Sequence, residues 1–408
     1  MMTHTFHIPV LGLGYSIDTP LKVAKYGISS VVSIVDDELT ERMRKYHAEL
    51  NQIPYTAISL KEEDSRARRI TAYLNLLDTI VKQQIATIKQ QAFGPETELT
   101  RYFELLPSTS PLKRRYLEAM LTENEKTRES LLLTLIEEVI PGSIDVNIMS
   151  KVDKPNYNAA NEYTGDEYTD ALAAMRGFAE STLQASIIIS AGLNPRLFAY
   201  MEKCKDFYPS EDVKPGKEII LKVSDYRSAY IQAKMLAKRG LWISEFRVES
   251  GLNCGGHAFA TDGFLMGPIL EEFKQKRNEL SEELWGIYSQ ALQGRDIQLA
   301  LQPQQRITVQ GGIGTAEEHD FLIDYYQLDA AGWGSPFLLV PEATNVDEST
   351  LEALVTAEEK DFFLSNSSPL GVLFNNFKKS TAEDLRLERI AKGRPGSPCK
   401  KKFLVNNT

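Results

Sequence analysis

Eight short runs of apolar and β-branched residues are the feature that most constrains the fold of this 408-residue chain. Most of them are separated by helix-like segments, and most are continuous rather than alternating in polarity. Such runs are expected for strands buried on both faces of a parallel sheet. Eight strands alternating with helices favour an α/β fold, a (β/α)8 TIM barrel, with a doubly wound open sheet as the alternative. The predicted strands cover residues 6–12, 28–35, 144–149, 187–191, 218–223, 243–249, 306–310 and 328–333.

A long segment between the second and third predicted strands exceeds what a minimal barrel needs. Residues 61–93 and 112–140 contain neither Gly nor Pro and carry apolar residues at helical spacing. They predict a helical hairpin, inserted over residues 61–142, whose arms would each reach roughly 40–50 Å. We interpret the insertion as a packed subdomain or a dimer contact, with an active-site lid as the alternative.

The C-terminal part, residues 346–408, is predicted to be an extension of the barrel. It begins as an acidic helix and ends in the basic stretch GRPGSPCKKKFLVNNT. We interpret the stop after the apolar FLV as either a truncation or a frayed end. The barrel domain itself is then expected over residues 1–345, interrupted by the insertion.

Composition excludes several classes of protein. The net charge of -10 argues against a nucleic-acid-binding surface, which needs clustered cations. No apolar run reaches the roughly 18 residues that span a bilayer, and no secretory signal is visible, so we expect no membrane partner. The three cysteines are too scattered for a disulfide framework or a Cys-based zinc site, which favours a reducing cytoplasm. The five histidines include no H-E-x-x-H pair, and no metal site is expected.

Two glycine-rich stretches follow the last two predicted strands. In RITVQGGIGTAEE, Gly311 and Gly312 come directly after the strand, and Thr315 and Glu318 form a capping box for the next helix. The stretch AAGWGSPF places another glycine and a serine at the following strand end. Glycines let backbone N–H groups approach an anion, and barrels often build phosphate sites from the loops after strands seven and eight. The pair therefore predicts a phosphate cradle, whereas either stretch alone is typical of a tight turn.

The stretch GLNCGGHAF follows the sixth predicted strand. Gly255 and Gly256 allow close approach to a flat ligand, and His257 then stands at the C-terminal mouth of the barrel. A histidine there can accept a proton from a carbon acid near pH 7 or return one. The alternative is a loop histidine that only makes hydrogen bonds.

Six segments in the same order resemble the nitronate monooxygenase (2-nitropropane dioxygenase) family of FMN-dependent barrels, which includes flavin enoyl-thioester reductases. The segments are IPVLGLGYSIDTPLKVAKYG, IDVNIM, KEIILKVSDYRSAYIQAKMLAKRG, SGLNCGGHAF, ITVQGGIGTAEE and AAGWGSPFLLVPEA. The chain departs from the family pattern at Asn253, where the family has an acidic residue, at Cys254, where it has alanine, and at Pro336, where it has arginine. Cys254 is interpreted as a small filler, with a reactive thiol as the alternative.

The resemblance implies the positions of the cofactor and of the catalytic group. It implies that the FMN phosphate lies near the backbone of Gly311, Gly312, Gly334 and Ser335. It implies that Gly12, Leu13, Gly14 and Asn147 face the flavin ring, that Gly255 and Gly256 line the site, and that His257 is the catalytic residue. Lys222 and Lys151 are candidate charge partners of the flavin or substrate, or else solvated lysines of the rim.

Together with the glycine-rich stretches, the resemblance implies an FMN-dependent oxidoreductase that oxidises a small carbon acid or nitronate with O2, with His257 as catalytic base. The first alternative is an enoyl-thioester reductase in which NAD(P)H donates electrons to FMN. A second, of another class, is a non-catalytic barrel that binds FMN or another phosphate ligand and docks a partner through its helical insertion. A third is a phosphate-binding isomerase or lyase without flavin. The expected partners are a small-molecule substrate and, through the insertion, a second copy of the chain.

Overall fold

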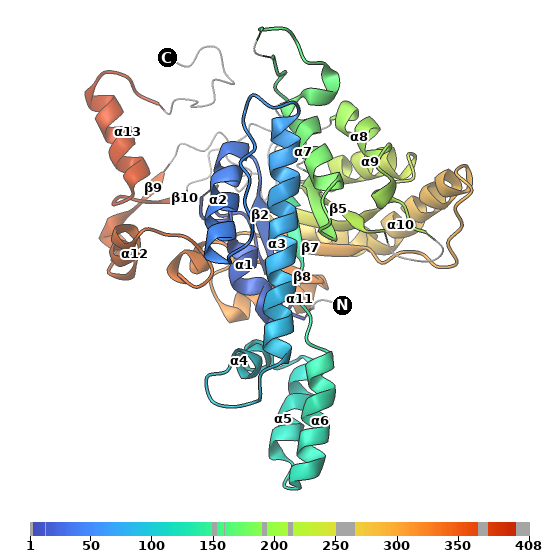
Figure 1. The fold of residues 1–408 in the computed structure, drawn as a ribbon, viewed down its shortest axis with the longest axis vertical. Coiled ribbons are helices and arrows are strands. Elements are labelled where there is room, and N and C mark those ends of the chain that lie inside the picture. The colour runs from blue at the N-terminus through green and yellow to red at the C-terminus, as the bar shows by residue number, and fades with distance from the viewer. Residues whose placement is uncertain are drawn as a thin grey trace.

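The computed structural model describes residues 3–12, 14–148, 153–158, 160–189, 194–210, 215–249, 266–365 and 374–396. Eight parallel strands close into a barrel in which each strand pairs with the next along the chain, and β8 returns to pair with β1 (Figure 1). This confirms the predicted (β/α)8 TIM barrel and excludes the open sheet. The strands are β1 (Phe6–Ile8), β2 (Ser29–Ser33), β3 (Ile144–Asn147), β4 (Ala185–Ile189), β5 (Lys217–Val223), β6 (Ile243–Glu249), β7 (Arg306–Gln310) and β8 (Ala330–Gly332).

All eight observed strands fall on the predicted ones, but the first is shorter than expected. Strand β1 ends at Ile8 rather than at residue 12, because Pro9 has no N–H with which to continue the pairing. The predicted fourth strand ran to residue 191, and its last two residues lie outside the described part of the chain.

Helices follow the strands and cover the barrel. Asp225 caps α9, since its carboxylate accepts a hydrogen bond from the N–H of Ser228 at 2.7 Å, and Gly240 lies beyond the helix end at a φ of 73°. Every described helix is too short or too polar to cross a membrane. The helices around the barrel are α1 (Thr19–Val23), α2 (Asp37–Leu50), α7 (Asp170–Ala179), α8 (Pro195–Met201), α9 (Tyr226–Ala237), α10 (Met266–Gln293) and α11 (Ala316–Tyr326).

The segment between β2 and β3 contains four helices beyond α2. The first, α3 (Ser65–Lys89), packs against α2 and α7, and a short helix, α4 (Glu98–Leu105), follows it. The single arm predicted over residues 112–140 is wrong, because the chain reverses there between α5 (Pro111–Leu121) and α6 (Glu125–Glu137). Asn124 begins the second of these helices by accepting a hydrogen bond from the N–H of Thr127 at 3.0 Å. Figure 1 shows α5 and α6 side by side, projecting away from the barrel.

The C-terminal part contains strands as well as the predicted helices. Helix α12 (Glu348–Val355) is followed by β9 (Phe362–Ser365) and β10 (Phe374–Phe377), which pair as an antiparallel sheet, and then by α13 (Thr381–Ala391). The prediction of an acidic helix at the start of this part is confirmed, but the two strands were not predicted.

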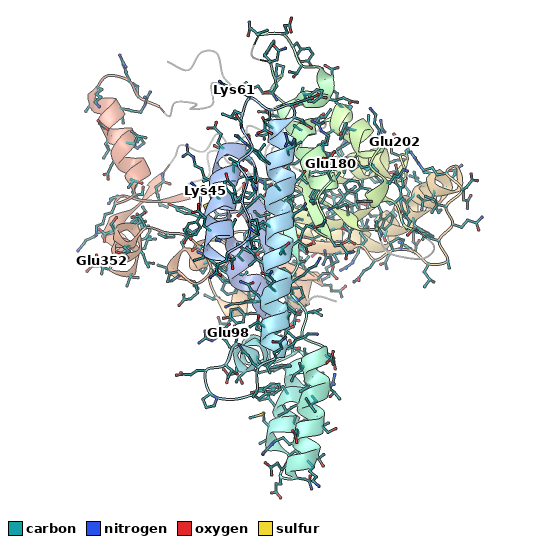
Figure 2. The ribbon with its side chains drawn as sticks, in the orientation of Figure 1. Lys45, Lys61, Glu98, Glu180, Glu202 and Glu352 are labelled. Atoms are coloured by element: carbon teal, nitrogen blue, oxygen red, sulfur yellow. The ribbon has the colours of Figure 1, made fainter. Side chains whose placement is uncertain are left out.

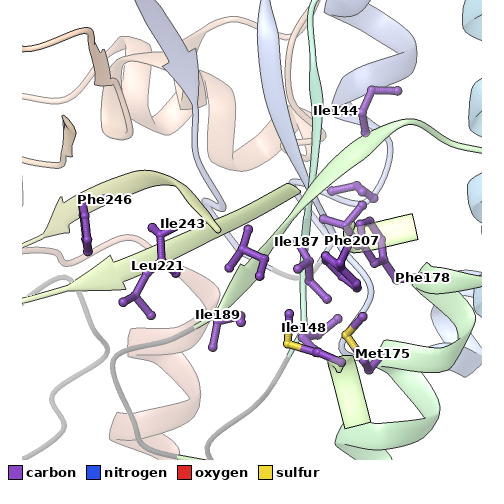
Figure 3. Close-up of a cluster of buried hydrophobic side chains, with 14 of the residues drawn as sticks. Ile144, Ile148, Met175, Phe178, Ile187, Ile189, Phe207, Leu221, Ile243 and Phe246 are labelled. Carbon is purple, nitrogen blue, oxygen red and sulfur yellow. The ribbon is translucent and has the colours of Figure 1, made fainter. Parts of the chain in front are cut away.

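The main apolar core lies between the barrel wall and its helices. Figure 3 shows this layer, where Ile187 of β4 lies near Phe207 and near Phe178 of α7. Charged side chains such as Lys45, Glu180 and Glu352 lie on the outside of the molecule (Figure 2). Inside the barrel the apolar cluster is small and consists of Val31, Ile188 and Ile220.

Candidate functional site

Charged side chains fill much of the barrel lumen. Arg247 of β6 is fully buried, and its guanidinium contacts Asp145 of β3 at 2.8 Å and Glu245 of the same strand at 2.7 Å. Arg306 of β7 approaches Glu245 at 3.0 Å, and the Thr308 hydroxyl donates to it at 2.6 Å. A buried charge is costly unless it is paired, so these residues must hold one another in place.

The pKa shifts in the lumen follow from this arrangement. Burial disfavours the charged form of Glu245, but Arg247 and Arg306 outweigh burial and lower the pKa of Glu245 to about 2. Burial raises the pKa of Asp145, and the nearby charge of Arg247 only partly offsets this.

His7 of β1 lies in the same lumen, next to the glycine of β8. The space that a side chain at Gly332 would need is taken by the His7 ring and by Gln310. Burial and then the charge of Arg247 lower the pKa of His7 to about 3, so its imidazole is neutral. The side chain of Gln310 and the charge of Glu245 oppose this lowering of the His7 pKa but do not outweigh it.

A polar row crosses the C-terminal ends of three strands just above the lumen. The Lys222 ammonium of β5 lies 2.9 Å from the Glu249 carboxylate of β6, and the Gln310 amide of β7 donates to that carboxylate at 2.6 Å. Glu249 is only 1% exposed, and the Lys222 side chain is 20% exposed. Lys222 is therefore partly exposed and paired with Glu249, and its role toward a flavin or substrate stays a prediction.

A cavity of about 520 Å³ opens at the C-terminal mouth of the barrel. The loops after β1, β7 and β8 line it, so the two predicted glycine-rich stretches do converge on one place. Its lining residues are Pro9, Val10, Leu11, Gln310, Gly311, Gly312, Ile313, Gly314, Glu318, Gly334 and Leu338.

The glycines of this cavity leave room for a ligand close to the backbone. Gly311 and Gly312 adopt φ values of 88° and 74°, which residues with side chains rarely adopt. A β-carbon added at Gly312 would meet no atom within 4 Å and would extend into open space. Within the described part of the structure, the backbone N–H groups of Gly312, Ile313 and Gly334 donate to no other group. Backbone N–H groups that have no acceptor of their own beside a glycine-lined cavity suit a phosphate group.

One carboxylate beside this cavity carries a negative charge that would repel an incoming anion. Glu318, from the first turn of α11, accepts hydrogen bonds from the N–H groups of Gly314 at 2.7 Å and Thr315 at 3.1 Å. The predicted capping box with Thr315 is therefore present. An incoming phosphate has to use the amides before Gly314, because the side chain of Glu318 occupies the next two.

The other predicted site residues lie around this mouth or outside the described chain. Asn147 is the last residue of β3 and is half-buried, in register with Ser33 and Ile188. Gly12 and Gly14 belong to the loop after β1 but do not line the cavity, whereas Leu11 does. Ser335 begins a short 3-10 helix that ends at Leu339. Six residues lie outside the described part: Leu13, Lys151, Cys254, Gly255, Gly256 and His257.

Sequence reasoning missed Glu249 and Gln310. Both stand at the last position of a predicted strand, in register with each other across β6 and β7. The signal that could have found them is a polar residue at the C-terminal end of a buried strand, because barrels place functional groups there.

A second cavity, of about 990 Å³, lies at the opposite end of the barrel. Residues at or near the starts of the strands line it, among them Ser29, Ser186 and Ser244. Barrel enzymes place their chemistry at the C-terminal face, so the smaller mouth cavity is the better candidate for the active site. No group of three or more potential metal ligands occurs among the residues that the structure describes.

Comparison with known proteins gives few similarities. No protein-family model matches the chain, and no curated protein sequence matches it significantly. Among solved structures, the enoyl reductase domain of MlnA from the macrolactin biosynthesis cluster of Bacillus amyloliquefaciens is similar, with 15% sequence identity and a TM-score of 0.38. The similarity covers 69% of this chain and 64% of that one, so the chain spans less than two thirds of that structure's length. The barrel assignment rests on strand order and pairing, not on this similarity.

Proposed function

We propose that the protein is an FMN-dependent oxidoreductase of the nitronate monooxygenase type, with the flavin at the C-terminal mouth of the barrel. The observation that carries the proposal is the cavity between the loops after β1, β7 and β8, where the N–H groups of Gly312, Ile313 and Gly334 donate to no group in the described part of the structure. The ordered resemblance of six sequence segments supports the same cofactor.

Each part of the mouth has a role in this proposal. The amides of Gly312, Ile313 and Gly334 hold the phosphate, and the apolar side chains of Val10 and Leu11 exclude water from one wall. Glu249 holds the ammonium of Lys222 in place at the C-terminal end of β5. When bound, FMN supplies the redox step, accepting electrons from the substrate and passing them to O2. His257 removes the acidic proton of the substrate.

Gly312→Ala is expected to weaken FMN binding at least tenfold. The new β-carbon points into the cavity, and a φ of 74° costs a side chain about 1 kcal/mol. Binding is measured by titrating the protein with FMN and following flavin fluorescence. The matched control is Gly393→Ala, since Gly393 has a φ of 67° and open space around it but lies in the C-terminal part of the chain.

The control separates backbone strain from ligand contact. Both variants are expected to lose similar stability, but only Gly312→Ala is expected to lose FMN. If the wild-type protein takes up no FMN at all, the cofactor assignment is wrong. If both variants bind FMN like the wild type, the phosphate does not lie on this loop.

His257→Ala is expected to abolish turnover and to leave the FMN content unchanged, because the phosphate is held by other residues. Two assays are run with each protein: O2 consumption with an alkyl nitronate, and NAD(P)H oxidation with an enoyl thioester. Activity in the second assay alone favours the reductase, and FMN binding without either activity favours the non-catalytic barrel. Turnover that survives the substitution shows that His257 is not the catalytic base.

A further inference from the structure

The cavity at the N-terminal end of the barrel is large enough to hold a small molecule. Its volume of about 990 Å³ lies at the upper end of the range of roughly 300–1,000 Å³ that ligand pockets occupy. Protein interiors leave few voids larger than a water molecule, so ordinary packing does not account for a space of this size. This cavity and the mouth cavity share no lining residue. A ligand here would therefore not occupy the proposed FMN position.

Arg306 presents a guanidinium group to this cavity. It is the first residue of β7, and its side chain is 21% exposed. One terminal nitrogen lies 3.0 Å from Glu245, and among the residues that the structure describes the other N–H groups of Arg306 have no acceptor. A guanidinium carries five N–H donors in a planar fork that matches a carboxylate. Arg306 therefore retains donors for an anionic ligand.

Two buried hydroxyl groups line the same cavity. Ser186 of β4 is 5% exposed and Tyr288 of α10 is 1% exposed. Within the described chain, neither hydroxyl makes a hydrogen bond. Buried polar groups are nearly always hydrogen-bonded to protein or to water. A ligand that accepts hydrogen bonds in this cavity would supply the partner that each hydroxyl lacks.

The other charges of the lining do not favour a cation. The Asp329 carboxylate contacts Arg277 at 2.6 Å, so its negative charge is already compensated. Glu218 also lines the cavity and would repel an anion. Its neighbour Lys217 donates to the Ser181 carbonyl at 2.9 Å and makes no ion pair within the described residues, so its positive charge offsets that of Glu218. The open donors of Arg306 therefore decide in favour of an anion.

Aromatic side chains supply an apolar part of the lining. Trp242 and Phe207 are 7% and 2% exposed, and the Trp242 and Tyr288 ring centroids lie 5.1 Å apart. The indole N–H of Trp242 donates to the Gln304 carbonyl at 3.3 Å, which fixes the orientation of the ring. Aromatic surfaces held in place in this way suit a flat apolar ligand body.

We propose that the cavity at the N-terminal end of the barrel binds an aromatic carboxylate. Arg306 holds the carboxylate, the hydroxyls of Ser186 and Tyr288 are further donors, and the aromatic body lies against Trp242 and Phe207. This is a binding site and not a second active site, because barrels place their chemistry at the opposite end. The proposal does not depend on FMN binding.

The test is isothermal titration calorimetry of the whole chain with 2-naphthoate. Binding is expected to be saturable and at least about tenfold tighter than for the uncharged 2-naphthamide. Arg306→Lys retains the charge beside Glu245 but removes the planar fork, and it is expected to weaken binding at least about tenfold. The control is Arg115→Lys, since Arg115 pairs with Glu138 at 2.6 Å but does not line the cavity.

A second variant tests the site without disturbing the lumen charges. Tyr288→Phe removes only the unpaired hydroxyl and is expected to weaken binding about fivefold. Tyr157→Phe is its control, because Tyr157 is 57% exposed and lies outside the cavity. Circular dichroism verifies that each variant is folded, and Tyr288→Phe decides alone if Arg306→Lys is not.

Three results would overturn the proposal. The first is a wild type that does not bind 2-naphthoate or binds 2-naphthamide as tightly. The second is an affinity that neither cavity variant lowers relative to its control. The third is displacement of 2-naphthoate by excess FMN, which would place it at the mouth of the barrel. The same affinity with and without FMN is the expected result.

Discussion

Replacing Arg247 with methionine is expected to lower the free energy of unfolding by about 3–5 kcal/mol. The substitution removes the only guanidinium that contacts both Asp145 and Glu245 within the described lumen, and it leaves these carboxylates buried. A buried charge that loses its partner retains the full cost of leaving water. The measurement is urea denaturation at pH 7.

A second arginine–aspartate pair supplies the control. Arg277 contacts Asp329 at 2.6 Å, but the two side chains are 29% and 23% exposed. Arg277→Met is therefore expected to cost about 1 kcal/mol or less. Equal losses for the two variants would show that the lumen charges are solvated rather than buried.

His7→Asn is expected to flatten the acid dependence of stability. The pKa of His7 is about 3 in the folded protein against 6.5 for an ordinary histidine, mainly because the ring is buried. Below pH 6.5 the unfolded chain gains a proton at His7 that the folded protein does not bind, so stability falls as the pH decreases toward 3. The slope from this one group approaches about 1.4 kcal/mol per pH unit.

The experiment compares unfolding free energies of the two proteins between pH 7 and pH 5. The raised pKa of Asp145 acts in the opposite direction, but it is present in both proteins and largely cancels in the difference. His4→Asn is the control, because burial also lowers the pKa of His4 but its bond to the Tyr26 carbonyl works against the shift. The same slope in wild type and His7→Asn would mean that His7 is protonated inside the folded protein.

The barrel could be predicted because each strand carries its own local signal. The run III in β4 is apolar on both faces, and few structures other than a covered parallel strand suit it. The reversal between α5 and α6 could not be predicted in the same way. The residues Thr122, Glu123 and Asn124 include no Gly or Pro, and the turn depends on the cap that Asn124 provides.

The site could be predicted only where sequence dictates backbone conformation. The convergence of the loops at Gly311 and Gly334 followed from the rule that parallel strands end at one edge. The charged lumen follows a pattern that was present in ISEFRVE, where Glu245, Arg247 and Glu249 alternate with apolar residues. Their pairing with Asp145 and Gln310 depends on the register between strands, which no single segment contains.

The carboxylate of Glu318 gives the loop after β7 an internal anion. It accepts hydrogen bonds from the amides of Gly314 and Thr315, and so it holds this part of the loop in place. The phosphate of the proposed FMN would find the neighbouring amides already in position and would lose little affinity to ordering the chain. The negative charge of Glu318 would also repel that phosphate, so the loop would favour ligands that make further contacts elsewhere in the mouth.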